Sequence, residues 1–458
     1  MAAAYPVDSR GVVESLASIL LELQHRGQEA AGIAVVTRDG RLKLLRGPGT
    51  IFEAMPIERL RELASEEPVC GIGHVRYSTS GGYMEYGAQP IVAGKRPRIA
   101  LAFNGNIVNY AEIARIAGLT HVPSDAYALA GLVSYLATEH GGDVIEALRE
   151  LPSYVVGSYS LAILTDEPRI VVARDPIGFR PLSISLGPGL YAASENPALE
   201  AIGLERWREV EPGEIVSFDG SSLEVTRARG GSGRVAPCIF EYVYFSRPDS
   251  VFNGVEVYSA RLRMGMELGR NAPAEADIVI PVPDSGRPAA IGFSRVTGIP
   301  IGEGFAINKY LGRGFISPPS IRGAVTRLKY GVIRSEVRGR RVVLVDDSIV
   351  RGTTIRALAS RIYRAGAREV HVRVASPPFR YPCFMGIDVP VRRELAAWRK
   401  SLGELAKDLG VDSVAYNTLE SVVKAVGLPS VCHACFSGLY PLPGIDLEEV
   451  ERVLGVRR

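Results

Sequence analysis

One short segment constrains this chain more than any other, and it reads VVLVDDSIVRGTT over residues 342–354. Its opening branched apolar residues predict a parallel strand that is covered on both faces of a sheet. Two acids, Asp346 and Asp347, end that strand, and a small-residue loop then opens a helix. Carboxylates can hold ribose hydroxyls and a divalent metal, and backbone N–H groups at a helix N-terminus bind phosphate. The segment therefore predicts a sugar-phosphate site at the end of the strand.

Two other interpretations of this segment are weaker. It lacks the lysine and the glycine spacing of a Walker loop, so an ATP site is the less favoured alternative. A strand that simply leads into a capped helix is also compatible, with Asp347 or Ser348 as the cap. A cap needs one such residue, whereas this loop carries several acids and hydroxyls together, so we favour the sugar-phosphate site.

The composition is that of an ordinary globular protein. A chain of 458 residues is long for one hydrophobic core, which predicts two domains. Hydrophobic residues make up 47% and charged residues 22%, which is a usual balance. The net charge of +3 is too small to indicate a nucleic acid or a membrane surface as a partner.

The cellular location is expected to be the cytoplasm. Charged residues such as Asp8, Arg10 and Glu14 interrupt the first stretch, so a signal peptide is not expected. No uncharged apolar run is long enough to span a bilayer. The 5 cysteines form an odd set in a large chain, which argues against a disulfide scaffold.

The first half mixes short strands and helices without simple alternation. Apolar runs at 33–36, 99–103 and 160–164 predict buried strands, and apolar spacing predicts helices over 11–24 and 125–138. Because strands and helices do not alternate here, this half is expected to layer helices on antiparallel sheets.

The second half has a different pattern. A glycine-rich turn at 230–233 marks the seam, which gives predicted domains of 1–230 and 231–458. Strand candidates at 278–282, 342–345 and 370–374 are separated by helical segments, and this order predicts a mostly parallel sheet. The tail from Leu395 onward is predicted to be helical.

Polar groups in the first half suit an amino-acid pocket. A free amino acid needs an arginine for its carboxylate and an acid for its ammonium group, which Arg76 and Asp125 supply. An oxyanion intermediate needs N–H donors, which Asn104 and Gly105 supply. Each residue also has a plain alternative: a surface ion pair for Arg76, a hairpin turn for Asn104-Gly105 and a helix cap for Asp125 or its neighbour Ser124.

Several strings together resemble one known family. The 342–354 segment resembles the phosphoribosyl pyrophosphate (PRPP) loop of type I phosphoribosyltransferases. Its sequence is most similar to that of the glutamine PRPP amidotransferases of purine synthesis. The strings LQHRGQEAAGI (23–33), GHVRYSTSG (73–81) and FNGN (103–106) resemble the glutaminase domain of that family. The resemblance implies an N-terminal four-layer αββα N-terminal-nucleophile hydrolase domain. It implies a type I phosphoribosyltransferase domain with a mostly parallel sheet after it.

The resemblance also implies the ligands of each site. The substrates would be PRPP with glutamine or ammonia, with Mg²⁺ as cofactor, and the chain would form a homo-oligomer. A glycine-punctuated loop at 308–316 resembles the loop that closes over PRPP in the family, although Gly314 replaces the usual threonine. The implied Mg²⁺ ligands are Ser285, Asp346 and Asp347, and the implied glutamine-binding residues are Arg76, Asn104, Gly105 and Asp125. The implied PRPP-binding residues are Lys309, Tyr310, Lys329, Asp346, Asp347, Ser348, Arg351, Gly352, Thr353 and Thr354.

The catalytic nucleophile of the family is not found. In the family it is a cysteine at the mature N-terminus, whereas this sequence starts MAAAYPV and has no cysteine before Cys70. Met1 is a thioether with no proton to give, and Ala2 has no nucleophilic group. Cys70 reads as a core strand residue. Three alternatives stay open: a cysteine missing from the sequence as given, an enzyme that uses only free ammonia, or a first domain with a structural or glutamine-sensing role.

The remaining four cysteines suggest a metal centre. The CHAC motif at 432–435, taken alone, is compatible with a zinc site, with a redox function or with no specific function. The contexts PCIFEY (237–242), YPCF (381–384) and CHACF (432–436) resemble the iron–sulfur branch of the family. That resemblance implies a [4Fe–4S] cluster, and four thiolates would also suit Zn²⁺. The implied ligands are Cys238, Cys383, Cys432 and Cys435.

The resemblance therefore implies an amidophosphoribosyltransferase that would form 5-phosphoribosylamine and pyrophosphate from PRPP and ammonia or glutamine. Two alternatives are kept beside it. One is an ammonia-only PRPP aminase with an inactive glutaminase domain, and the other is a non-enzymatic regulator that binds PRPP and glutamine.

Overall fold

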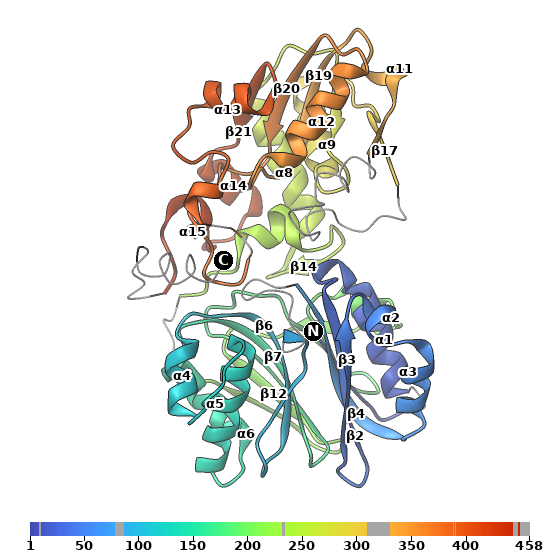
Figure 1. Cartoon of the computed structure of the whole chain (residues 1–458), viewed down its shortest axis with the longest axis vertical. Coiled ribbons are helices and arrows are strands. Elements are labelled where there is room, and N and C mark those ends of the chain that lie inside the picture. The colour runs from blue at the N-terminus through green and yellow to red at the C-terminus, as the bar shows by residue number, and fades with distance from the viewer. Residues whose placement is uncertain are drawn as a thin grey trace. The chain divides into compact units, whose positions relative to one another are not determined.

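The computed structural model describes residues 1–8, 11–77, 87–230, 234–308, 330–387, 389, 391–442 and 448. The chain divides into two compact units, which are described separately (Figure 1). Unit 1 comprises Met1–Pro237, Phe384–Asp388 and Tyr440–Arg458, and unit 2 comprises Cys238–Cys383 and Val389–Leu439. The assignment of functional domains to 1–230 and 231–458 stays a prediction. In the described part of the chain, no helix combines the length and apolar character needed to cross a bilayer.

Unit 1 contains two antiparallel sheets. The first has the strand order β11-β9-β10-β1-β4-β2-β3, and the second has the order β13-β12-β8-β7-β6-β5. The strands of the first sheet are β1 (Ala2–Pro6), β2 (Ala30–Thr37), β3 (Leu42–Pro48), β4 (Pro68–Arg76), β9 (Ser183–Ser185), β10 (Gly189–Ala193) and β11 (Trp207–Glu209). Those of the second sheet are β5 (Ile91–Ala93), β6 (Ile99–Ile107), β7 (Gly157–Thr165), β8 (Arg169–Arg174), β12 (Glu214–Phe218) and β13 (Leu223–Arg227).

Apolar residues on both faces of the strands produce four layers. In β2, Ile33 and Val35 pack against the helix α1, whereas Ala34 and Val36 face the second sheet. In β6, Leu101 packs against the helix α5 on the outer face of that sheet. Figure 1 shows α1 to α3 covering one sheet and α4 to α6 covering the other. These helices are α1 (Val12–Glu22), α2 (Ile51–Ala54), α3 (Ile57–Ala64), α4 (Tyr110–Ile116), α5 (Asp125–Glu139) and α6 (Val144–Glu150), with α7 (Pro197–Glu200), η1 (Gln24–Arg26) and η3 (Leu151–Ser153) beside them. The predicted αββα arrangement is confirmed.

Unit 2 is built on a four-stranded parallel sheet. Its order, β16-β19-β20-β21, follows the chain, and helix α9 packs on β16 and β19. A core of branched residues lies between the sheet and α12 and α13. The strands are β16 (Ile278–Pro281), β19 (Arg341–Asp346), β20 (Glu369–Val374) and β21 (Ser413–Tyr416), with hairpins of β14 (Val251–Phe252) with β15 (Val255–Glu256) and β17 (Phe305–Ile307) with β18 (Tyr330–Val332). The helices are η4 (Glu241–Phe245), α8 (Val257–Asn271), α9 (Arg287–Thr297), α11 (Arg334–Val337), α12 (Thr353–Arg364), η6 (Arg392–Glu394), α13 (Leu402–Leu409), α14 (Leu419–Val426) and α15 (Ala434–Ser437).

The parallel sheet and its three predicted strands are confirmed, but the prediction of an all-helical tail is wrong. The strand β21 lies inside that tail and pairs in parallel with β20, with His371 opposite Ser413. The four residues of β21 are too few for the spacing of their apolar side chains to distinguish a strand from a helical turn. Their conformation is therefore decided by pairing with β20.

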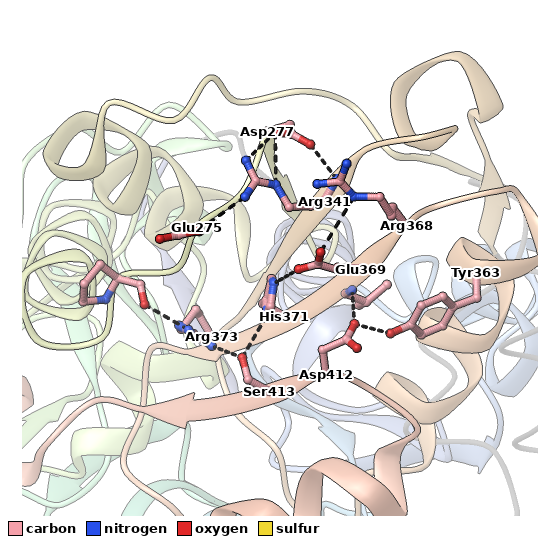
Figure 2. A network of polar contacts seen from close by, with 12 residues as sticks. Glu275, Asp277, Arg341, Tyr363, Arg368, Glu369, His371, Arg373, Asp412 and Ser413 are labelled. Atoms are coloured by element: carbon pink, nitrogen blue, oxygen red, sulfur yellow. Dashed lines mark hydrogen bonds and ion pairs between the residues drawn. The ribbon is translucent and has the colours of Figure 1, made fainter.

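Polar side chains tie together the amino ends of these strands (Figure 2). Arg341, at the start of β19, donates from its backbone N–H to Asp277 at 2.8 Å and from Nη2 to the same carboxylate at 2.9 Å. Asp412 precedes β21 and accepts from the Val370 N–H at 2.7 Å and from the Tyr363 hydroxyl at 2.5 Å. The network fixes the starts of neighbouring strands and leaves their carboxyl ends for other groups.

The variant Asp412→Ala should therefore destabilise unit 2. It leaves the N–H of Val370, which is fully buried, without its side-chain acceptor, and this should cost about 1–3 kcal/mol. The midpoint of thermal unfolding reports the loss. The matched control is Arg368→Ala, since that exposed ion pair with Glu369 at 3.7 Å should contribute less than about 0.5 kcal/mol. Equal effects of the two variants would contradict the role given to Asp412.

Candidate functional site

The acid pair lies at the carboxyl end of β19 in unit 2. Asp346 and Asp347 are both buried, and the Asp347 N–H donates to Asp346 Oδ1 at 3.0 Å. The Val282 N–H donates to the Val345 carbonyl at 2.8 Å, so the chain that leaves β16 towards Ser285 runs beside the acids. The structure thus brings the three residues predicted to hold Mg²⁺ to one edge of the sheet.

Burial controls the protonation of this pair. Burial raises the pKa of Asp346 well above its ordinary value, and the neighbouring Asp347 carboxylate raises it further. Burial also raises the pKa of Asp347, while hydrogen bonding to Asp346 and the positive charge of Arg261 oppose that rise. Asp347 Oδ2 is buried and has no hydrogen-bond partner among the described residues. An acceptor in that condition suits a cation or a hydroxyl donor.

The loop after the acids ends at the N-terminus of α12. Gly352 is the N-cap residue with a φ of 77°, and no side chain caps the helix there. The alternative in which Asp347 or Ser348 is the cap is therefore wrong. Backbone N–H groups at the first turn of a 12-residue helix remain available for an anion. Of the residues predicted to bind PRPP, Ser348, Arg351 and Gly352 lie in this loop, and Thr353 and Thr354 are the first two residues of α12.

A later segment that the sequence did not indicate holds this loop in place. Arg351 donates from Nε to Glu394 Oε2 at 3.1 Å, and the Ala396 N–H donates to the Val350 carbonyl at 2.8 Å. A Cβ atom on Gly352 would lie 2.9 Å from Leu409 Cδ2. Glycine is therefore required there both for its positive φ and for the close approach of α13.

The predicted residues Lys309, Tyr310 and Lys329 lie outside the described part of the chain. Tyr330 follows them and is described. Its hydroxyl donates to the Pro283 carbonyl at 3.2 Å, and burial together with the negative charge of Asp346 raises its pKa.

The four glutamine-pocket residues all lie in unit 1. Arg76 ends β4, Asn104 and Gly105 lie in β6, and Asp125 is the first residue of α5. Asp125 accepts from the N–H groups of Ile107 at 3.2 Å and Ala126 at 2.9 Å. Burial raises the pKa of Asp125, and the Arg76 guanidinium opposes that rise. Burial lowers the pKa of Arg76, and the charges of Glu29 and Asp125 oppose that change. The side chains of Arg76 and Asp125 are therefore both partly buried and close enough to influence each other's pKa.

Asn104 and Gly105 are strand residues, so the alternative of a hairpin turn is wrong. They pair with Ser160 and Tyr159 of β7. Asn104 Nδ2 is buried and has no hydrogen-bond partner in the described structure. A buried donor without a partner is what an oxyanion needs.

Comparisons with known proteins agree with this geometry. A family model for a glutamine amidotransferase domain matches residues 74–201. An amidophosphoribosyltransferase of Archaeoglobus fulgidus is 44% identical over 94% of this chain and 95% of its own length, and one of Pyrococcus horikoshii is 44% identical over 94% of each. The structure of a glutamine PRPP amidotransferase from B. subtilis complexed with ADP and GMP matches with a TM-score of 0.84 at 36% identity, over 98% of this chain and 99% of that one. The chain belongs to the amidophosphoribosyltransferase family. It is an enzyme, a pentosyltransferase of the first step of purine biosynthesis.

Met1 immediately precedes β1 of the first sheet and is buried. Met1 is 2% exposed, and its amino group donates to Ser194 Oγ at 3.2 Å. Burial, with the positive charge of Arg26, lowers the pKa of this amine to about 4. Cys70 is fully buried in β4, and burial raises the pKa of its thiol. The prediction that Cys70 is a core residue is confirmed, and a buried neutral thiol is a poor nucleophile.

Four cysteines gather in unit 2. The Ile239 N–H donates to the Cys432 carbonyl at 3.0 Å, and the N–H groups of Arg380 and Tyr381 both donate to the Cys435 carbonyl at 3.1 Å. Burial raises the pKa of Cys435, and the nearby thiols of the other three cysteines raise it further. Within the described ranges, however, no group of three or more His, Cys, Asp or Glu residues is arranged to hold a metal ion. The cysteines identified from the sequence are neighbours, and their metal remains a matter for proposal.

The variant Asp346→Asn should stabilise the protein and abolish its turnover. The raised pKa means that the pair stabilises the fold when protonated and that this stability is lost as pH rises through the raised pKa. Because the charged form of Asp346 is disfavoured in the fold, the neutral amide should raise the midpoint of thermal unfolding. Pyrophosphate release should fall by about 100-fold or more.

The matched control is Asp277→Asn at the opposite edge of the sheet. Hydrogen bonds from Arg341 lower the pKa of Asp277, so loss of that charge should destabilise the protein. Pyrophosphate release should persist in the control. Destabilisation by both variants would contradict the account of the acid pair.

Proposed function

We propose that unit 2 carries the PRPP site and that unit 1 carries a glutamine pocket. The observation that carries this proposal is the buried acid pair directly before an uncapped helix N-terminus. A sugar that carries a phosphate and a diphosphate needs both acceptors for its hydroxyls and donors for its phosphates. The proposed PRPP-binding residues are those predicted from the sequence: Lys309, Tyr310, Lys329, Asp346, Asp347, Ser348, Arg351, Gly352, Thr353 and Thr354.

We propose Mg²⁺ as the cofactor of this site, with Ser285, Asp346 and Asp347 close to it. The fit rests on two carboxyl groups with raised pKa values and on the buried Oδ2 of Asp347 without a partner. Magnesium prefers oxygen ligands and, when bound, supplies positive charge for a departing pyrophosphate.

The protein then contributes binding, orientation and exclusion of water. The N-terminus of α12 receives a phosphate group, and the carboxylates orient the ribose for attack at its anomeric carbon. Neutral ammonia attacks opposite the departing pyrophosphate and gives 5-phosphoribosylamine with inversion. Ammonia is already a nucleophile, so this step needs no dedicated base.

For the glutamine pocket we propose one role for each residue. Arg76 binds the carboxylate of the amino acid, and Asp125 binds its ammonium group. The Asn104 side chain and the Gly105 N–H bind the oxyanion that forms when the amide is attacked. The buried, unpartnered Nδ2 of Asn104 supports this assignment.

The source of ammonia is tested by placing a cysteine at position 1 of the sequence as given. A protein with Met1→Cys, released from a cleavable leader, should release pyrophosphate with PRPP and glutamine. The protein with Met1 should release it only with ammonium, because Cys70 is buried with a raised pKa. Coupled detection of pyrophosphate measures both rates.

Two results would contradict these proposals. Glutamine-dependent turnover by the protein with Met1 would exclude the ammonia-only alternative and require another nucleophile. No turnover with ammonium would exclude the PRPP site. In the Met1→Cys protein, Asp125→Asn should remove glutamine-dependent turnover and leave the ammonium-dependent rate unchanged.

We further propose a [4Fe–4S] cluster on Cys238, Cys383, Cys432 and Cys435, with Zn²⁺ as the alternative. The proximity of the other three thiols to Cys435 supports it. Anaerobic purification should give a brown protein with about four iron atoms per chain and broad absorption in the visible range. Cys435→Ser should lose that absorption, and a colourless protein with one zinc per chain would contradict the cluster. The cytoplasmic location and the homo-oligomer stay predictions.

A further inference from the structure

A four-residue segment, Phe384–Ile387, belongs to unit 1 although the chain on both sides of it belongs to unit 2. Phe384 is 1% exposed, Met385 is fully buried and Ile387 is 6% exposed. The ring of Phe384 stacks on Tyr440, another late residue of unit 1, with centroids 4.9 Å apart. The segment is therefore an integral part of the core of unit 1.

Unit 1 holds this segment by its backbone. Three consecutive carbonyl groups each accept a side-chain donor: Phe384 from Asn106 Nδ2 at 2.8 Å, Met385 from Ser158 Oγ at 2.8 Å, and Gly386 from Arg180 Nη2. Ser158 is fully buried and Arg180 is 1% exposed. Recognition of backbone atoms by buried donors fixes the path of the segment, because each donor would otherwise be desolvated without compensation.

The segment reaches the strand that carries the proposed oxyanion donors. Gly386 has a φ of 97°, and a Cβ atom built there would lie 2.7 Å from the Gly105 carbonyl oxygen and 2.8 Å from its carbon. Asn106, which binds Phe384, is the next residue along β6, and it pairs with Ser158 of β7. The backbone of Gly386 therefore lies directly against the backbone of Gly105.

We propose that Phe384–Ile387 is a positioning element for glutamine hydrolysis, which braces β6 so that the Asn104 and Gly105 donors point at the oxyanion. The inference rests on the proposed glutamine pocket. An oxyanion hole must be preorganised, and a shift of a few tenths of an ångström in Gly105 misdirects its N–H. Among the described residues, neither Arg76 nor Asp125 contacts the segment itself, and Asp125 is linked to β6 only through the Ile107 N–H at the end of the strand. The segment should therefore act more on the rate of hydrolysis than on glutamine affinity.

The test compares two glycine substitutions with similar backbone strain. In Gly386→Ala the new methyl group meets Gly105, whereas in Gly142→Ala, at a φ of 103°, it meets nothing within 4 Å. In the Met1→Cys protein, Gly386→Ala should lower the kcat for glutamine-dependent turnover by about tenfold or more. The KM for glutamine and the ammonium-dependent rate should change less than twofold. Gly142→Ala should preserve all three values.

Hydrogen exchange of peptides that cover β6 gives a readout independent of turnover. Exchange over residues 103–107 should be faster in Gly386→Ala than in Gly142→Ala. Absence of glutamine-dependent turnover in the Met1→Cys protein would contradict the proposed glutamine pocket. In that case hydrogen exchange of β6 would still test whether Phe384–Ile387 braces this strand. Equal exchange in the two variants would overturn the brace itself.

A second variant applies if Gly386→Ala does not fold. Ser158→Ala removes the donor to the Met385 carbonyl without adding volume. It should lower the glutamine-dependent kcat several-fold and leave the ammonium-dependent rate unchanged. Unchanged glutamine kinetics in Ser158→Ala would overturn the proposal.

Discussion

The burial of two adjacent carboxyl groups at the end of β19 is the constraint on which the site in unit 2 depends. Asp346 and Asp347 are 6% and 5% exposed, so their charges lose hydration and repel each other at short range. Protons or a cation must compensate for that loss, which is why burial raises both pKa values. The fold tolerates the cost because the branched residues of the same strand are packed between helices.

The two edges of the parallel sheet therefore have different roles. At the amino edge, Asp277 and Asp412 have their acceptor positions filled by neighbouring N–H and O–H groups. At the carboxyl edge, Asp347 has a buried oxygen with no such donor within the described residues. The proposed site therefore lies at the edge where parallel sheets tend to bind ligands, beyond the carboxyl ends of their strands.

Local sequence patterns predicted those strands and strand ends whose structure depends on neighbouring residues in the chain. The apolar run at 33–36 predicts a buried strand, and the acids after 342–345 predict a site at a strand end. Contacts between residues far apart in the sequence left no such signal. The strand β21 forms because β20 lies beside it, Glu394 became part of the site through its contact with Arg351, and the role of Phe384–Ile387 depends on donors more than 200 positions away. No periodicity in a single sequence encodes such contacts.

The two proposed pockets use unsatisfied buried atoms of opposite kind. Several buried polar atoms of each unit have no hydrogen-bond partner among the described residues; in the proposed pockets they include a donor, Nδ2 of Asn104, and an acceptor, Oδ2 of Asp347. A buried donor favours a ligand on which negative charge develops, and a buried acceptor favours a cation or a hydroxyl group. The donor in unit 1 thus suits the oxyanion proposed to form from the amide there. The acceptor in unit 2 suits the metal-bound sugar proposed for that unit.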